Sequence, residues 1–546
     1  MDSSSDKEKI NQIINYLENL ESRISRLEAK LDIDPSSSSG DINQTPIFSN
    51  SISVNTESLE NQIGQFWFAK VGTVILTIGI IFLLTFPYQN LPPALPGIAG
   101  YLFSGVLFLL SHYWRVSLKF LSQYIFGSAL LLLFFSTMRL HYFGINPAIE
   151  NITIEMILLV LIAVLHLIIS YKRKSVYLTA LGVTFATLTA LIGNNFYSLF
   201  ILLMILSFLI VYLKLKYEWN GIFIFGIILV FFAELIWVIN NPLIGNQLEL
   251  QNPPYSFAVS LLIFAFIFAC GNILRSNKKT EDSIVIVSTI LICFMSYALF
   301  FFITLVKFSE AAAASNLLAS VIFLSLSILF WIREKSKYST FVYSMFGYLA
   351  LSVAIISNFP KPDFFIWLCW QSLLVISTAI WFRSKIIIVA NFVMYLIIFF
   401  AYLALADKIS AVTLGFGIVA LVSARILNWK KDKLDLKTEV MRLFYLGAAF
   451  FIFPYALYFI IPKDYISLSW TIVAVFYYVV SVVLKNKKYF WMAIITFLLT
   501  VIYILFVGST GNESVFRIIS FIVLGFVLLI ISIFNGKIKS KKELQS

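Results

Sequence analysis

Long apolar stretches alternate with short polar breaks from residue 67 to the end of the chain. Each stretch is about 17–22 residues long, which is the length a helix needs to cross a bilayer. The stretches are continuously apolar, without the period-two alternation of membrane β-barrel strands. The pattern therefore predicts an all-α, polytopic transmembrane helix bundle. We expect about eighteen spans, at residues 67–86, 94–113, 120–138, 153–171, 176–193, 196–213, 221–239, 256–274, 284–306, 311–331, 341–358, 364–382, 386–405, 409–427, 441–461, 467–484, 489–507 and 516–535.

The first 33 residues have a different pattern. Their apolar residues recur at spacings of three and four, which is the seam of a coiled coil. With Arg23 at position g and Glu28 at the following e, the pattern favours parallel self-association through residues 8–32 and hence a homo-oligomer. The alternative is a single amphipathic helix that lies on the membrane or on the protein's own loops. The seam consists of Ile10, Ile13, Leu17, Leu20, Ile24, Leu27 and Leu31.

A polar segment rich in Ser and Asn separates this helix from the first span. Such a composition predicts a flexible linker. The chain starts with a charged helix and not with a basic start followed by an apolar core, so we expect no secretory signal. The expected domains are a cytoplasmic coiled-coil helix (1–33), a linker (34–62), a transmembrane domain (63–536) and a basic cytoplasmic tail (537–546).

The charges of the loops predict the orientation of the spans in the membrane. The chain is 60% hydrophobic, only 12% charged, and carries a net charge of +12. Lys and Arg gather in the loops after even-numbered spans and in the tail, with 28 there against 6 in the loops after odd-numbered spans. Residues of the basic loops include Lys174, Lys214, Arg275 and Lys488. Cytoplasmic loops are the basic ones, so both termini should be cytoplasmic, and membrane topology explains the positive charge without nucleic-acid binding.

The first span contains two glycines seven residues apart, Gly72 and Gly79. Small residues let helix backbones approach closely in a membrane. We therefore expect another helix to pack on this face.

Three segments are similar to an uncharacterised bacterial membrane family, domain of unknown function 2339. They are "LENQIGQFWFAKVGTVILTIGIIFLLTF", "LPPALPGIAGYLFSGVLFLLSHYW" and "YLTALGVTFATLTALIGN". The third departs from the family pattern, because Gly182 is followed by Val-Thr-Phe-Ala and no proline. The resemblance implies an N-terminal coiled coil, a linker and a long series of spans in the bacterial cytoplasmic (inner) membrane. It implies no reaction.

Glu234 is the one acidic residue well inside an apolar stretch, in "LVFFAELIWVINN". A carboxylate in lipid is costly, so the side chain should point into the bundle, and intramembrane acids often serve proton or cation transport. Two structural alternatives are a neutral carboxyl that is hydrogen-bonded to a neighbouring helix and one that reaches outward past Trp237.

Glu155 and Arg139 flank the third and fourth spans near the outer surface. They are candidate outer-rim partners of Glu234 in an ion pair, although solvated loop-end charges are the preferred interpretation. The widely separated His112, His141 and His166 show no metal-ligand spacing. Three cysteines, Cys270, Cys293 and Cys369, lie within apolar stretches and are expected to be core residues.

No nucleotide-binding loop, zinc-protease motif or nucleophile elbow occurs in the sequence. We therefore expect neither an enzyme nor a bound cofactor or metal. The preferred function is a membrane scaffold or assembly component whose constant partner is the lipid bilayer. A transporter of a small or lipidic solute, with Glu234 as the coupling group, comes second. An intramembrane enzyme comes third, because one carboxyl is too little for a catalytic site.

Overall fold

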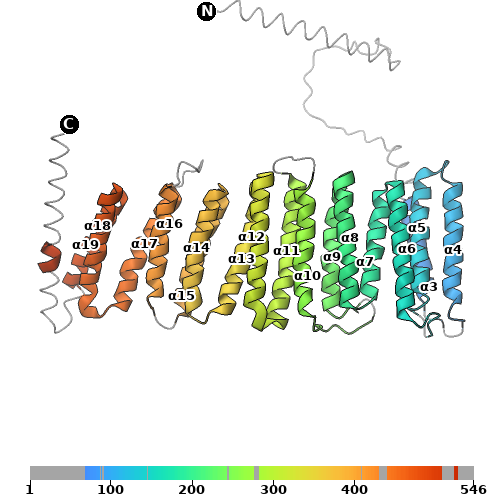
Figure 1. Cartoon of the computed structure of the whole chain (residues 1–546), viewed down its shortest axis with the longest axis horizontal. Coiled ribbons are helices and arrows are strands. Elements are labelled where there is room, and N and C mark those ends of the chain that lie inside the picture. Colours follow the sequence, from blue (N-terminus) through green and yellow to red (C-terminus); the bar gives the residue numbers. More distant parts are fainter. Residues whose placement is uncertain are drawn as a thin grey trace, which may run out of the picture. The chain divides into compact units, whose positions relative to one another are not determined.

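The computed structural model describes residues 68–86, 88, 91–143, 146–242, 245–275, 282–406, 409–429, 439–506 and 522–526, and in these residues it contains helices and no strand (Figure 1). The long helices are α3 (Phe68–Thr85), α4 (Leu95–Tyr113), α5 (Lys119–Met138), α6 (Ile152–Arg173), α7 (Val176–Ile192), α8 (Phe196–Tyr217), α9 (Asn220–Val238), α10 (Tyr255–Ile273), α11 (Ser283–Lys307), α12 (Ala312–Glu334), α13 (Lys337–Asn358), α14 (Asp363–Trp381), α15 (Lys385–Leu405), α16 (Val412–Trp429), α17 (Glu439–Ile460), α18 (Ile466–Leu484) and α19 (Lys487–Phe506).

Each expected span from 67–86 to 489–507 corresponds to one of these helices, which confirms the all-helical prediction for the described part of the chain. Fifteen of the described helices are long and apolar enough to cross a membrane, and the apolar segments Gly72–Thr85 and Val176–Ile192 are shorter. The last expected span, 516–535, is described only at its helical residues 522–526. The predicted coiled coil (1–33), linker (34–62) and tail (537–546) lie outside the described residues.

Contacts divide the chain into two units, Met1–Ala69 and Lys70–Ser546. The helices of the second unit pack mainly on helices one or two places away in the chain, as in the hairpins α4–α5, α6–α7, α10–α11 and α12–α13. Contacts also join odd-numbered helices in succession from α5 to α17, and even-numbered helices α8 to α10, α10 to α12 and α14 to α16. The odd and even helices of this unit therefore form two layers.

In the described residues, four helical hairpins have the same kind of tight turn. Each of these turns follows an even-numbered helix. A Lys or Arg takes a left-handed conformation, with φ between 48° and 51°. The next residue is Ser or Asn, and its side chain accepts a hydrogen bond from a backbone N–H in the first turn of the following helix. The chain thus reverses in few residues and keeps a cation at the turn. The turns are Lys174–Ser175, Lys335–Ser336, Arg383–Ser384 and Lys485–Asn486.

Buried apolar side chains form two large clusters. One runs from Val183 to Ala350, and the other from Tyr348 to Leu524. Both clusters include residues of α13, so this helix links them. Many other large apolar side chains are exposed, as expected where lipid is the surrounding solvent.

The predicted close approach at Gly72 and Gly79 is wrong for the described residues, because a Cβ added at either glycine would meet none of their atoms within 4 Å. The close approach occurs one helix later, at Gly100. There an added Cβ would lie 2.2 Å from Ser136 Oγ of α5 and 2.9 Å from Leu84 Cδ2 of α3. Gly100 thus permits the contact of α4 with both neighbours.

Candidate functional site

Glu234 lies on α9, about one turn before the helix ends, and its side chain is fully buried. The expected inward orientation is confirmed. Helix α9 packs against α7, α8 and α11, so the carboxyl is enclosed between the two helix layers.

The immediate surroundings of Glu234 are apolar and aromatic. Val230 and Trp237 share its helical face and are both buried. The Trp237 ring stacks on Phe257 with 5.4 Å between centroids. Neither carboxyl oxygen of Glu234 has a hydrogen-bond partner among the described residues. Among the described residues, the side chain neither bonds to a neighbouring helix nor reaches the surface, which argues against both structural alternatives.

Arg139 is not a solvated loop-end charge, because only 4% of it is exposed. Its Nη1 donates to the carbonyl of Tyr142 at 3.2 Å, and its Nη2 donates to the carbonyl of Phe86 at 3.3 Å. The backbone N–H groups of Ala148 and Ile149 donate to the Leu140 carbonyl, which folds the loop back over this end of α5. Burial lowers the pKa of the Arg139 guanidinium.

Glu155 is also buried, with no exposed area, in the first turn of α6. Neither of its carboxyl oxygens has a hydrogen-bond partner among the described residues. Tyr142 lies close enough to the Glu155 carboxyl to interact with it electrostatically. Burial raises the pKa of Tyr142 to about 12, and the charge of Glu155 acts in the same direction. The preferred prediction of solvated charges is therefore wrong for both Glu155 and Arg139.

The predicted rim ion pair is absent as well. Among the described residues, no ion pair joins Arg139 to Glu155 or Glu234. No ion pair or hydrogen bond in the described structure therefore joins the three candidate residues Arg139, Glu155 and Glu234 into one site.

Arg275 forms a partly buried ion cluster at the opposite, basic end of the helices. Its Nη1 lies 2.7 Å from Asp282 Oδ2, and its Nη2 lies 2.9 Å from Glu334 Oε2. The Asp282 side chain also accepts a hydrogen bond from the N–H of Ile284 and so caps α11. One guanidinium therefore joins the ends of α10, α11 and α12.

Lys214 of α8 belongs to a second polar network near these ion pairs. Its Nζ donates a hydrogen bond to Asn272 Oδ1 of α10 and lies 3.6 Å from the ring centroid of Phe223 of α9. Asn272 Nδ2 in turn donates to Ser288 Oγ of α11 at 3.0 Å. Only 5% of Lys214 is exposed. The prediction that Lys214 is a loop cation is therefore wrong, and sequence reasoning did not find this polar network.

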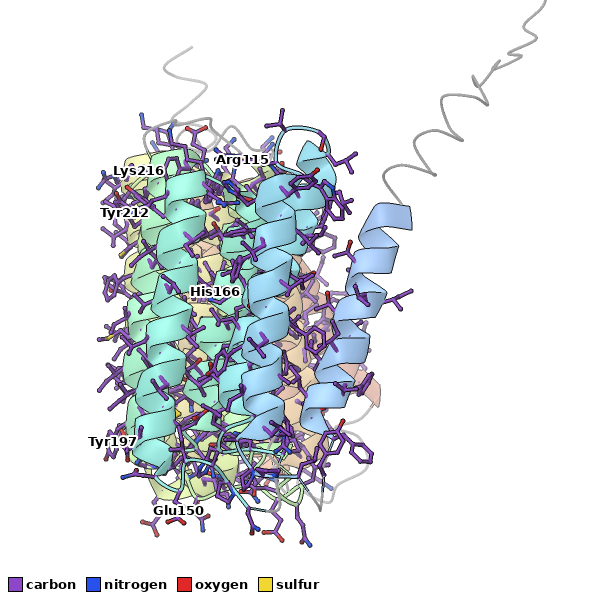
Figure 2. The ribbon with its side chains drawn as sticks, turned by 90° about the vertical axis from the view of Figure 1, so that its right-hand side faces the viewer. Arg115, Glu150, His166, Tyr197, Tyr212 and Lys216 are labelled. Carbon is purple, nitrogen blue, oxygen red and sulfur yellow. The ribbon has the colours of Figure 1, made fainter. Side chains whose placement is uncertain are left out.

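Lys216, two residues on, remains exposed at the same end of α8. Figure 2 shows Lys216, Tyr212 and Arg115 near one end of the helices, with Tyr197 and Glu150 near the other. The four basic turns and Arg275 all follow even-numbered helices, so they belong to one end of the described helices.

His166 is buried between two backbone carbonyls, with Nδ1 2.8 Å from the Ile162 oxygen and Nε2 2.9 Å from the Leu130 oxygen. It therefore links α6 to α5. Within the described residues, no group of three His, Cys, Asp or Glu side chains is placed to hold a metal ion. Cys293 and Cys369 are buried and Cys270 is half-buried, all with free thiols.

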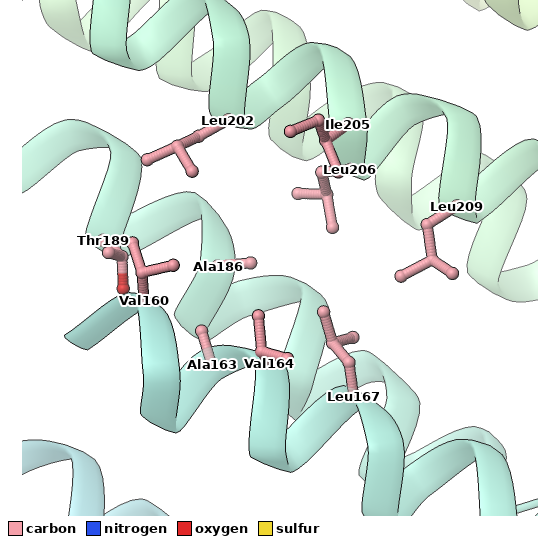
Figure 3. Close-up of a pocket in the computed structure, with 10 residues that line it drawn as sticks. All are labelled: Val160, Ala163, Val164, Leu167, Ala186, Thr189, Leu202, Ile205, Leu206 and Leu209. Atoms are coloured by element: carbon pink, nitrogen blue, oxygen red, sulfur yellow. The ribbon is translucent and has the colours of Figure 1, made fainter. Parts of the chain in front are cut away.

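Two apolar grooves open between helices in the described structure. The α6–α8 groove is formed by α6, α7 and α8 (Figure 3), and the second is formed by α16, α17 and α18. Neither is lined by Glu234, Glu155 or Lys214. The grooves and the buried charges are therefore separate features.

No family model, curated protein or solved structure matches this chain. The resemblance to domain of unknown function 2339 stays a prediction.

Proposed function

We propose that this chain is a non-enzymatic, multi-pass membrane protein with a scaffold or assembly role. The observation that carries the proposal is the packing order, in which helices contact partners one or two places away in the chain. Proteins built in this way are quasi-one-dimensional and present extended surfaces to partners. The ion pairs of Arg275 and the hydrogen bond of Lys214 support the same role, since they hold helix ends together.

The proposed setting is the bacterial cytoplasmic membrane, with both termini in the cytoplasm and the lipid bilayer as the constant partner. The loop charges support this orientation. We also propose membership of the family of domain of unknown function 2339, which the three similar segments support.

The scaffold would self-associate through residues 8–32. Leu17→Asp with Leu20→Asp places two charges in the predicted seam and should abolish cross-linking between protomers of the full chain in native membranes. The matched control is Asn15→Asp with Ser22→Asp, which adds the same charge at the outer f positions and should cross-link like the unmodified chain. Equal cross-linking by both variants would contradict self-association through this face.

A proton- or cation-coupled carrier is the second candidate. The specific observation that favours it is Glu234, a fully buried carboxyl without a hydrogen-bond partner among the described residues. The test is proton uptake into proteoliposomes that contain the full chain, followed by an internal pH dye. A carrier predicts uptake that Glu234→Gln abolishes and that Glu150→Gln, at an exposed position, leaves unchanged.

A further inference from the structure

The α6–α8 groove is apolar along its length. Val160, Val164 and Leu167 of α6 face Ile205 and Leu209 of α8 across it, and Ala186 of α7 lies at its floor (Figure 3). The hydroxyl of Thr189, also in the lining, donates its proton to the Phe185 carbonyl at 2.8 Å, and the other lining side chains are apolar. The groove therefore suits a hydrocarbon chain.

The two rows of side chains that form the groove walls, one on α6 and one on α8, continue as two stripes toward the basic end of the helices. On α6, Tyr171 follows Leu167 by four residues. On α8, Tyr212 and Lys216 follow Leu209 by three and seven residues, so they lie on the same helical face. From Val160 to Tyr171 the helix rises about 16 Å at about 1.5 Å per residue. This rise matches one leaflet, which is about half of the 30 Å hydrocarbon core.

A cluster of polar groups stands at this end of the stripes. Lys216 Nζ donates to the hydroxyl of Tyr171 and, at 2.9 Å, to the hydroxyl of Tyr212. Lys216 is exposed, and 47% of Tyr212 is exposed, near the basic end of α8 (Figure 2). An ammonium has three N–H groups. The third N–H of Lys216 and the two tyrosine hydroxyls can therefore bind a phosphate.

We propose that the α6–α8 groove with Tyr171, Tyr212 and Lys216 is a binding site for one anionic phospholipid of the leaflet on the basic side. One acyl chain lies along the groove, and the headgroup phosphate binds Lys216 and the tyrosine hydroxyls. Charge complementarity selects an anionic lipid, since the exposed ammonium of Lys216 stands beside the tyrosine hydroxyls at the headgroup end of the groove. This inference requires only that the helices cross a bilayer and does not rest on the scaffold role.

The test is native mass spectrometry of the purified full chain in micelles that contain either phosphatidylglycerol or phosphatidylcholine. We expect a retained phosphatidylglycerol molecule and at least tenfold less phosphatidylcholine. Lys216→Gln should weaken phosphatidylglycerol retention about fivefold, the effect of one lysine near an anionic headgroup. The control Lys172→Gln removes an exposed charge from the same end of α6 and should have a much smaller effect.

A second pair of variants tests the groove itself. Ile205→Trp fills the α6–α8 groove and should prevent cross-linking of a phosphatidylglycerol carrying a diazirine on its acyl chain to α6 and α8. Ile418→Trp, which fills the second groove, should leave this cross-linking unchanged. The proposal is overturned if both lipids are retained equally, if Lys172→Gln costs as much as Lys216→Gln, or if cross-links spread evenly over the lipid-facing helices.

Discussion

Arg275 donates two hydrogen bonds to one carboxylate oxygen of Glu334, from Nε at 3.3 Å and from Nη2 at 2.9 Å. The two residues are 59 positions apart in the chain, and the Glu334 side chain is almost fully buried. The contact fixes the end of α12 to the segment that follows α10. Because Arg275 also pairs with Asp282, one guanidinium bridges two acids at this place.

Arg275→Gln should therefore destabilise the protein, because it leaves the Glu334 carboxylate buried and unpaired. Breaking a buried ion pair costs about 3 kcal/mol or more. The measurement is the midpoint of thermal unfolding of the full chain in detergent. Arg333→Gln, at an exposed neighbouring position, is the control and should shift the midpoint little. The double variant Arg275→Gln with Glu334→Gln should recover part of the loss, and strictly additive losses would contradict direct coupling.

Glu234→Leu should raise the thermal stability of the chain. The wild-type carboxyl is buried without a described hydrogen-bond partner, and an unsatisfied buried polar group costs about 1–3 kcal/mol. Glu234→Gln keeps a polar group in the same place and should unfold near the wild-type temperature. A clear loss of stability in Glu234→Leu would mean that the carboxyl is held by a partner, such as a buried water.

Valine substitutions at Gly100 of α4 and at Gly79 of α3 should differ in their effect on stability. Gly100→Val adds atoms where a Cβ alone would lie 2.2 Å from Ser136 Oγ, and it should cost about 1–3 kcal/mol through overpacking. Gly79→Val is the control, since a Cβ added there meets nothing within 4 Å, and it should leave stability nearly unchanged. Thermal unfolding of both variants measures the difference. Equal losses would show that α3 packs on a helix through Gly79.

Reporter fusions test the orientation of the spans. Fusions at Lys174 and Lys488 follow even-numbered expected spans and should both report the cytoplasm, whereas a fusion at Glu150 should report the opposite side. The expectation rests on the 28-to-6 division of loop Lys and Arg. An extracytoplasmic signal at Lys174 or Lys488 would show that the expected register of the spans is broken.

Apolar length predicted the helices well because a span must satisfy its own backbone hydrogen bonds in lipid and so needs one long continuous stretch. The partners of a helix carry no such signal. Gly79 is a small residue of the kind found at close helix contacts, yet the contact forms at Gly100. Helix pairing depends on the complementary surface of α5 and not on the glycine alone.

The burial of the charged residues was hard to predict because it too depends on the segments that pack around them. Arg139 and Glu155 stand at helix ends, where solvation is the usual outcome, but a folded-back loop covers Arg139 and leaves backbone carbonyls as its partners. Lys214 did carry a signal, since Ser207, Val211 and Lys214 share one face of α8. That face is buried in the structure, whereas Lys216 lies outside it.

A scaffold is distinguished from a carrier by complementation of a deletion of the gene with two variants that accumulate normally. The scaffold account predicts that Glu234→Gln restores the wild-type phenotype and that Leu17→Asp with Leu20→Asp does not. The opposite result, in which the seam variant complements and Glu234→Gln fails, would contradict the scaffold account and favour a carrier coupled through Glu234.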